Sequence, residues 1–119
     1  MILGTSFKPE TDDIRESSSI KIVEICSTLN LEIFVHDPLS QDKFVDSLKS
    51  DITGVNDWKS EILDMDIVVI STAWQEYKFI ETLYTNGSLD QKIIIDGRGF
   101  LDKTIFKNNY FSVGHIKNY

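Results

Sequence analysis

The sequence has 119 residues, of which 41% are hydrophobic and 26% charged, and its formal net charge is −7. This length and composition are typical of one globular domain, so residues 1–119 are treated as a single unit. The negative charge argues against nucleic acid or an anionic membrane as a partner, because both bind basic surfaces. No apolar run approaches the roughly 18 residues of a membrane-spanning helix, so a membrane partner is not expected.

The first half of the chain alternates strand and helix signals. Residues 1–4 predict a buried strand that starts almost at the first residue, so we expect a piece of a longer protein. Residues 17–30 predict a helix with N-cap candidates among its first three serines. A second predicted strand, 31–38, ends at an Asp-Pro pair, and residues 40–48 predict a short helix.

The second half repeats this alternation. The run Asp-Ile-Val-Val-Ile is the clearest strand, and its unbroken apolar stretch predicts cover on both faces. A later Asn-Gly pair predicts the end of a helix. The predicted elements are, in order, a weak strand at 51–55, a helical turn or two at 58–65, a strand at 66–72, a helix at 74–87, a strand at 92–98 and a less regular strand at 108–116.

Apolar spacing predicts which side of each helix faces the core. In the helix at 17–30 the apolar residues recur at helical spacing, and in the helix at 40–48 they are clustered. Cys26 lies in the apolar part of the first helix, so we expect a buried structural thiol and not a nucleophile. The residues expected to face inward are Ile20, Val23, Ile25 and Leu29 in the first helix, and Phe44, Val45 and Leu48 in the second.

Strands that alternate with helices predict a mostly parallel sheet with helices on both faces, in a doubly wound, Rossmann-like α/β arrangement. Ligands of such sheets bind beyond the carboxyl ends of the strands. Three polar loops leave those ends: GTSFKPETDDIRE at 4–16, STAWQEY at 71–77 and DGRGFLD at 96–102.

The first of these loops does not predict a dinucleotide site. A dinucleotide turn reads G-x-G-x-x-G, whereas this turn reads G-T-S-F-K-P and lacks the second glycine. Asp37 stands where the ribose-binding acid of such a domain would be, but we favour its interpretation as an Asp-Pro strand stop. An independent NAD-binding fold is therefore rejected.

Three basic residues are expected at the carboxyl edge of the sheet: Lys8, Arg15 and Arg98. A phosphate or carboxylate there could be bound by the charge of Lys8 and the paired donors of Arg98. The alternative is that these residues form ordinary surface ion pairs. Their convergence on one edge leaves both interpretations open, and the candidate acidic partners are Asp12, Asp13, Glu16, Asp96 and Asp102.

Other candidate residues are fewer. His36 and His115 are far apart in the sequence and no cysteine has metal-ligand spacing, so no metal site is predicted. Trp74 could stack on a ligand ring, although packing under a loop is the commoner role. A single cysteine excludes an intrachain disulfide, and with no signal peptide at the start we expect a cytoplasmic protein.

The segment GTSFKPETDDIRESSS resembles the motif G-[LA]-[AS]-F-K-P-x-T-D-D-x-R-E-S of the UDP-glucose/GDP-mannose dehydrogenases, which opens their C-terminal domain. VHDP, DIVVISTAWQEYK and IIIDGRGFLD resemble later landmarks of that domain in the same order, and YFSVGHI loosely resembles its closing Tyr-x-Gly-x-Gly segment. The resemblance covers essentially the whole chain.

This resemblance implies a function and a set of site residues. The full enzymes of the family oxidise a nucleotide sugar at C6 to a uronic acid with two NAD and a catalytic cysteine, and a central helical region forms their dimer. The resemblance implies that Phe7, Lys8 and Arg98 contact a UDP-sugar, and that Arg15 reaches NAD held by another domain. The implied partners are therefore a UDP-sugar and the remaining domains of a parent dehydrogenase, with a homodimer at full length.

The sequence also departs from the family pattern. The catalytic G-x-C-x-P-K-D segment, the NAD fingerprint and the dimerising helix are missing from these residues, and Thr5 and Ser6 replace a Leu-Ala or similar pair. We therefore expect this chain alone to be inactive and to bind no NAD alone. The alternatives are a stand-alone nucleotide-sugar-binding or regulatory module, and a protein-interaction domain whose first loop only caps a helix. The identity of the base and the sugar is not readable from the residues.

Overall fold

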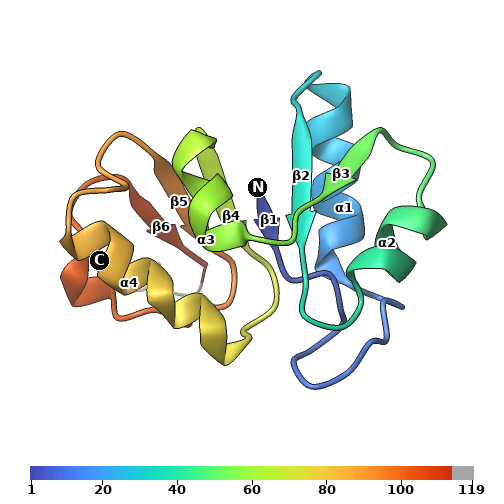
Figure 1. The fold of residues 1–119 in the computed structure, drawn as a ribbon, viewed down its shortest axis with the longest axis horizontal. Helices are drawn as coiled ribbons and strands as arrows, with labels where there is room; N and C mark the ends of the chain where they lie inside the picture. The colour runs from blue at the N-terminus through green and yellow to red at the C-terminus, as the bar shows by residue number, and fades with distance from the viewer. Residues whose placement is uncertain (114–119) are drawn as a thin grey trace.

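The computed structural model describes residues 1–113, which form a parallel α/β sandwich (Figure 1). Within these residues the strands make a six-stranded sheet in the order β3-β2-β1-β4-β5-β6, and every pairing is parallel. This order confirms the predicted doubly wound, Rossmann-like fold. The bounds are β1 Ile2–Leu3, α1 Ser18–Thr28, β2 Ile33–His36, α2 Gln41–Ser47, β3 Ile52–Gly54, α3 Trp58–Glu61, β4 Ile67–Ile70, α4 Phe79–Thr85, β5 Ile93–Asp96 and β6 Tyr110–Ser112, with 3-10 turns at Ile62–Asp64, Gln75–Lys78 and Lys103–Ile105.

The sheet separates two apolar cores. Ile2 and Leu3 are neighbours on β1 and point to opposite faces, as successive residues of a strand do, so each belongs to a different core. One core packs beneath α1 and α2, whose Val23 and Phe44 are fully buried. The other packs beneath α3 and α4. Helices on both faces are thus confirmed, with α1 and α2 beside β1 to β3 and with α3 and α4 beside β4 to β6 (Figure 1).

The prediction that the strand at 66–72 is covered on both faces is wrong. Val68 and Ile70 are fully buried, but Ile67 and Val69 on the opposite face are only half-buried. On the adjoining strands of that same face, Ile93 is 42% and Phe111 is 57% exposed. The reason is topological: within residues 1–113 the elements α3, α4 and the connection from β5 to β6 all pack in the core that contains Val68, Ile70 and Ile94, so this half of the sheet keeps its other face open.

The helices bear out most of the predicted faces. Ser17 caps α1 as expected and accepts a hydrogen bond from the Ser19 amide at 3.2 Å, and the apolar residues of α2 face inward. Ile25 and Leu29 were expected to face the core, but their side chains are 59% and 62% exposed. The buried stripe runs through Ser19 and Val23 instead. None of the helices within 1–113 has the length and hydropathy to cross a membrane.

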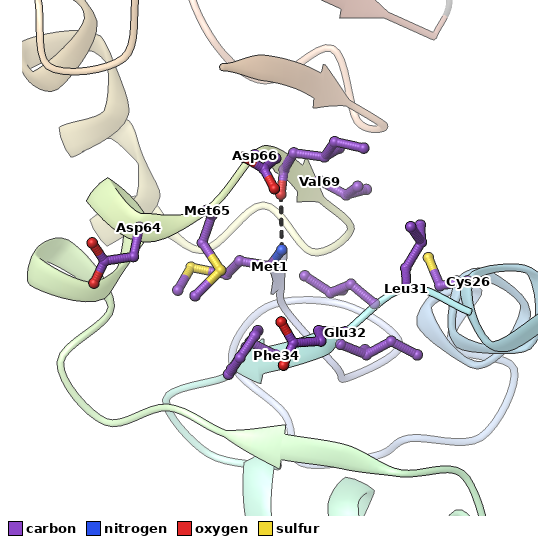
Figure 2. A pocket seen from close by; sticks show the side chains of 12 residues that line it. Met1, Cys26, Leu31, Glu32, Phe34, Asp64, Met65, Asp66 and Val69 are labelled. Carbon is purple, nitrogen blue, oxygen red and sulfur yellow. Dashed lines mark hydrogen bonds between the residues drawn. The ribbon is translucent and has the colours of Figure 1, made fainter. Parts of the chain in front are cut away.

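A cavity of about 190 Å³ opens at the amino edge of the sheet (Figure 2). Apolar residues from the starts of β1, β2 and β4 form most of its wall, and the amino group of Met1 donates to the Ile67 carbonyl at 2.8 Å. Cys26 also lines this cavity. Its thiol was expected to be buried, but the residue is only partly buried. None of the basic residues predicted to bind ligand lines it.

Candidate functional site

The predicted site lies at the opposite, carboxyl edge of the sheet. The strand order reverses between β1 and β4, and this switch point is where doubly wound sheets bind ligands. Three loops leave the edge here: the β1 loop (residues 4–17), the β4 loop (residues 71–74) and the β5 loop (residues 97–102). They carry every residue for which a binding role was predicted.

The β1 loop is closed by its own hydrogen bonds. The Phe7 amide donates to the Asp13 carbonyl at 2.6 Å, and the Ser6 hydroxyl donates to the Lys8 carbonyl at 2.8 Å. Glu10 and Glu16 adopt left-handed backbone conformations, with φ of 67° and 58°. Non-glycine residues in that region are costly and persist only where surrounding contacts hold them. Internal hydrogen bonds therefore hold the β1 loop in a defined conformation.

Lys8 and Arg98 have no neutralising partner in this part of the chain. Both side chains are exposed, and neither makes an ion pair or side-chain hydrogen bond with another residue of 1–113. Phe7, which precedes Lys8, is 45% exposed although it is a large aromatic residue. For Lys8 and Arg98 the alternative of surface ion pairs is thus not what the structure shows. Their expected contact with a UDP-sugar stays a prediction.

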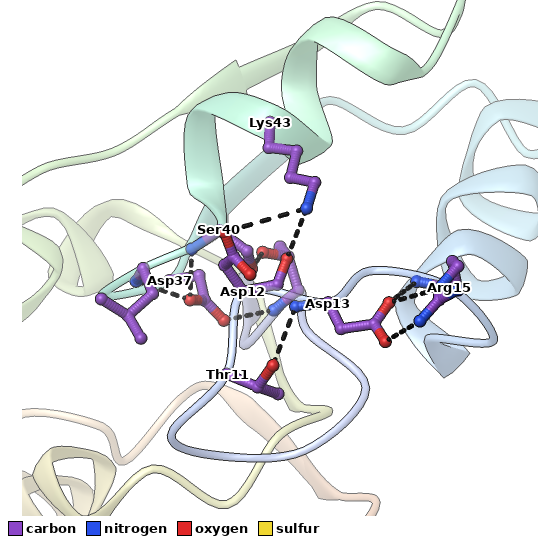
Figure 3. A network of polar contacts seen from close by, with 9 residues as sticks. Thr11, Asp12, Asp13, Arg15, Asp37, Ser40 and Lys43 are labelled. Atoms are coloured by element: carbon purple, nitrogen blue, oxygen red, sulfur yellow. Dashed lines mark hydrogen bonds and ion pairs between the residues drawn. The ribbon is translucent and has the colours of Figure 1, made fainter.

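Arg15 behaves differently, because it is paired with Asp13 (Figure 3). Its Nε and Nη2 atoms donate to the two carboxylate oxygens of Asp13 at 2.9 and 2.8 Å. These side-chain bonds, with a backbone bond from the Arg15 amide, hold the pKa of Asp13 well below its usual range. The ion-pair interpretation is correct for this residue. Arg15 remains 86% exposed, so its expected contact with NAD also stays a prediction.

A second contact ties the β1 loop to α2. Lys43 donates from Nζ to the Asp12 carbonyl oxygen at 3.2 Å, and its Nζ lies 3.8 Å from the Asp12 carboxylate (Figure 3). Both side chains are more than half exposed. An exposed pair of this kind contributes little to stability.

Asp37 directly follows β2, as the Asp-Pro interpretation predicted, and it also joins the β1 loop to the β4 loop. It is only 5% exposed. Its Oδ2 accepts from the Thr5 amide at 2.7 Å, the Ser6 amide at 3.3 Å and the Trp74 indole at 3.1 Å. Its Oδ1 accepts from the amides of Leu39 and Ser40 at 2.8 and 2.9 Å.

The protonation of Asp37 follows from this environment. Burial opposes its charged form, but the hydrogen bonds from backbone amides and from the Trp74 indole outweigh burial and hold the pKa of Asp37 below its usual value. Asp37 is thus a carboxylate with both oxygens already occupied. Trp74 packs under the loop, 7% exposed, as the commoner interpretation predicted.

Asp96 plays a corresponding part at the end of β5. It is fully buried, and its carboxylate accepts from the amides of Arg98 at 3.1 Å and of Phe100 and Leu101 at 2.8 Å. The Tyr110 hydroxyl donates to the same carboxylate at 2.7 Å. Asp96 therefore holds the β5 loop through its backbone and leaves the Arg98 side chain outside. The proposed pairing of Asp96 with a basic residue is not observed.

The β4 loop closes tightly over the start of the β1 loop. Gly4 has φ of +98°, and a Cβ placed on it would lie 2.3 Å from the Thr72 Cβ. The Thr72 hydroxyl donates to the Ser6 carbonyl at 2.9 Å, and the Ser19 hydroxyl donates to the Gly4 carbonyl at 2.6 Å. Thr72 of the β4 loop thus packs directly against Gly4, the one glycine of the first turn. The rejection of an independent dinucleotide site stays a prediction.

The two histidines do not form a site with each other in the described structure. His36 is buried and bonds through Nδ1 to the Tyr77 hydroxyl at 2.9 Å, while His115 lies outside the described residues. Burial lowers the pKa of His36. The nearby carboxylates of Glu76 and Asp37 raise it, but by less, so the pKa remains below its usual value. Within 1–113 no three histidine, cysteine or acidic residues come together as a metal site.

The strand order and the loops at its switch point define a Rossmann-like α/β binding domain. A family model described as the UDP-glucose/GDP-mannose dehydrogenase family, UDP binding domain, matches residues 1–103. The chain therefore belongs to the UDP-glucose/GDP-mannose dehydrogenase family, which confirms the resemblance read from its motifs.

Individual relatives agree with this assignment. A UDP-glucose 6-dehydrogenase of Rickettsia conorii is 30% identical over 117 residues, covering 95% of this chain and 27% of that protein. A putative UDP-glucose 6-dehydrogenase, YtcA, of Bacillus subtilis is 27% identical over 106 residues, covering 89% of this chain and 24% of that protein. The structure of a UDP-glucose dehydrogenase from Pyrobaculum islandicum matches with a TM-score of 0.74 and 33% identity, covering 92% of this chain and 24% of that one. The chain thus spans about a quarter of the length of these relatives.

Proposed function

We propose that this chain is the UDP-sugar-binding domain of an NAD-dependent nucleotide-sugar 6-dehydrogenase, an enzyme that oxidises a UDP-sugar to the corresponding uronic acid. One observation carries the proposal. In a domain of the family described as UDP binding, Lys8 and Arg98 stand at the carboxyl edge without a neutralising partner among residues 1–113. Unpaired cations at a switch point are suited to a diphosphate.

Each proposed contact has a physical role. Lys8 supplies a compact positive charge and Arg98 a planar pair of donors, which together suit the oxygens of a diphosphate. Phe7 offers an exposed ring beside Lys8, and an aromatic face of this kind can pack against a base or a sugar. Because Asp37 and Asp96 hold the loop backbones, these three side chains are left free to meet the ligand.

The oxidation itself is assigned to parts of a longer protein. Cys26 lines the cavity at the amino edge, opposite the proposed UDP-sugar site, so it is badly placed to attack a sugar bound there. We propose that other domains of a cytoplasmic, homodimeric parent supply the catalytic cysteine and bind NAD. Arg15, exposed and held only by Asp13, would turn from that pair toward the NAD of the neighbouring domain.

Calorimetric titration of the chain with UDP-glucose tests the binding proposal. Loss of one charge-assisted hydrogen bond costs about 1.5–3 kcal/mol, so Lys8→Ala and Arg98→Ala should each weaken the affinity by about tenfold or more. Lys49→Ala is the matched control, since it removes the same charge just before β3, at the amino edge.

Two results would contradict the proposal. The first is wild-type affinity in both the Lys8→Ala and Arg98→Ala variants. The second is a chain that binds no UDP-glucose, UDP or other UDP-sugar at millimolar concentration. Titration with NAD tests the assignment of NAD binding to other domains, because we then expect no heat of binding from this chain alone.

A further inference from the structure

We propose that Asp37 is a positioning residue: its carboxylate fixes the start of the β1 loop against the β4 loop, so that Phe7 and Lys8 are held ready for the ligand. The part of this proposal that concerns the ligand rests on the UDP-sugar-binding function proposed above. The part that concerns the loop can be tested without any ligand.

The contacts of Asp37 lie directly behind the ligand-facing residues. Thr5 and Ser6, whose amides donate to Oδ2 at 2.7 and 3.3 Å, immediately precede Phe7 and Lys8. The same oxygen accepts from the Trp74 indole at 3.1 Å, so one atom joins segments 32 and 37 residues away in the sequence. Any movement of this carboxylate would move the backbone that carries Lys8.

Asp37 itself is held rigidly. Its other oxygen accepts from the amides of Leu39 and Ser40 in the turn before α2. The Thr5 hydroxyl lies 2.6 Å from the Ser40 hydroxyl, which ties the β1 loop to that turn by a second bond. The carboxylate is therefore fixed to the end of β2 and transmits that fixed position to the β1 loop.

This arrangement also argues against a dinucleotide bound at the first turn. In dinucleotide-binding domains an acid at the end of the second strand accepts hydrogen bonds from a ribose. Here both oxygens of Asp37 are occupied by five donors of the protein, and the residue is 5% exposed. Thr72 packs on Gly4 beside it. Asp37 is thus an internal clamp, and a ligand must lie outside the loops that it joins.

Asp37→Asn is the sharpest perturbation, because it keeps the size of the side chain. The amide offers one acceptor oxygen, and its NH₂ group would face N–H donors that require an acceptor. Asp42→Asn is the matched control: it makes the same charge change on an exposed residue of α2, five positions away.

Amide hydrogen exchange measured by NMR is the direct readout. In Asp37→Asn we expect the Thr5 and Ser6 amides to exchange at least tenfold faster and the Trp74 indole resonance to shift. Amides of the sheet core, such as Val68 and Ile94, should keep their relative protection. In Asp42→Asn none of these values should change. UDP affinity should fall at least tenfold in Asp37→Asn and stay at the wild-type value in Asp42→Asn.

The outcomes separate this proposal from the proposed function. Unchanged exchange at Thr5 and Ser6 in Asp37→Asn would overturn the clamp, whatever happens to UDP. Faster exchange with unchanged UDP affinity would overturn its positioning role. Lys8→Ala should lose affinity with Thr5 and Ser6 still protected. If UDP does not bind even the wild type, the UDP-binding function fails while the exchange result still decides the clamp.

A second variant covers the case in which Asp37→Asn does not fold. Trp74→Phe removes one donor and leaves the carboxylate and the Thr5 and Ser6 amides in place. We expect exchange at Thr5 and Ser6 to rise at least twofold, because the β4 loop then no longer holds Oδ2. Wild-type exchange at both amides in this variant would overturn the link between the two loops.

Discussion

The contact between Gly4 and Thr72 gives a prediction whose size follows from the structure. An alanine at Gly4 would place its Cβ 2.3 Å from the Thr72 Cβ and 2.6 Å from the Thr72 backbone nitrogen, and φ there is +98°. A left-handed conformation costs an L-residue about 1–2 kcal/mol, and overpacking a close contact costs about 1–3 kcal/mol. Because backbone atoms are among those met, relief by a rotamer change is not available. We expect Gly4→Ala to lower the free energy of unfolding by about 2–5 kcal/mol.

Gly87 provides the internal control for that measurement. It also has positive φ, +87°, but a Cβ there would meet only the Asp90 carboxylate at 3.6 Å, an ordinary contact. Gly87→Ala should therefore show the conformational cost alone, about 1–2 kcal/mol. Urea denaturation followed by circular dichroism measures both, with unchanged m-values as the check on two-state unfolding. Equal losses in the two variants would refute the close approach of the β1 and β4 loops.

Two further predictions concern the pH dependence of stability and the open face of the sheet. Burial lowers the pKa of His36 below the value of about 6.5 in the unfolded chain, so the unfolded state binds the extra proton as pH falls below about 6.5, and stability should fall with it. His36→Asn keeps a donor for the Tyr77 hydroxyl but cannot titrate; its unfolding free energy should drop less between pH values of about 7.5 and 5.5, and an equal drop would contradict this assignment. Ile94→Lys should unfold the domain because it buries a charge, whereas Ile93→Lys, one residue earlier on the open face, should shift the thermal midpoint only slightly; similar shifts would mean that both faces are covered.

Much of the fold was predictable because buried parallel strands occur in a sequence as short apolar runs between amphipathic segments. The predicted strands and helices all occur within the described residues, and the last strand, predicted at 108–116, is observed as β6 at Tyr110–Ser112. The faces were less predictable. Apolar residues surround more than half of α1, so helical spacing could not decide that Val23 faces inward while Ile25 and Leu29 face out. The apolar run of β4 likewise could not reveal that no helix among residues 1–113 covers one of its faces.

The site was predictable in its location but not in its construction. Basic residues in loops that follow strands must lie at the carboxyl edge of a parallel sheet, and Lys8 and Arg98 do. The role of Asp37 was missed because its bonds reach donors up to 37 residues away in the sequence. The donors to Asp96 are nearer, at most 14 residues away, but most of them are backbone amides, which the side-chain pattern of a sequence does not reveal. A usable signal existed: each acid directly ends an apolar strand and is followed by a turn residue, which is where a carboxylate can collect free amides.

The charges at this edge support an anion as the ligand more strongly than their number alone suggests. The chain carries 19 acidic residues against 12 basic ones, so a carboxylate partner was available for almost any cation. Arg15 is paired with Asp13, and Lys43 lies beside Asp12. Asp37 and Asp96, the acids nearest in sequence to the strand ends, direct their oxygens to N–H and O–H donors behind the loops. Because these acids are occupied inward, no carboxylate of residues 1–113 pairs with Lys8 or Arg98. The diphosphate of the proposed UDP-sugar would therefore be attracted to this edge of an otherwise negative protein.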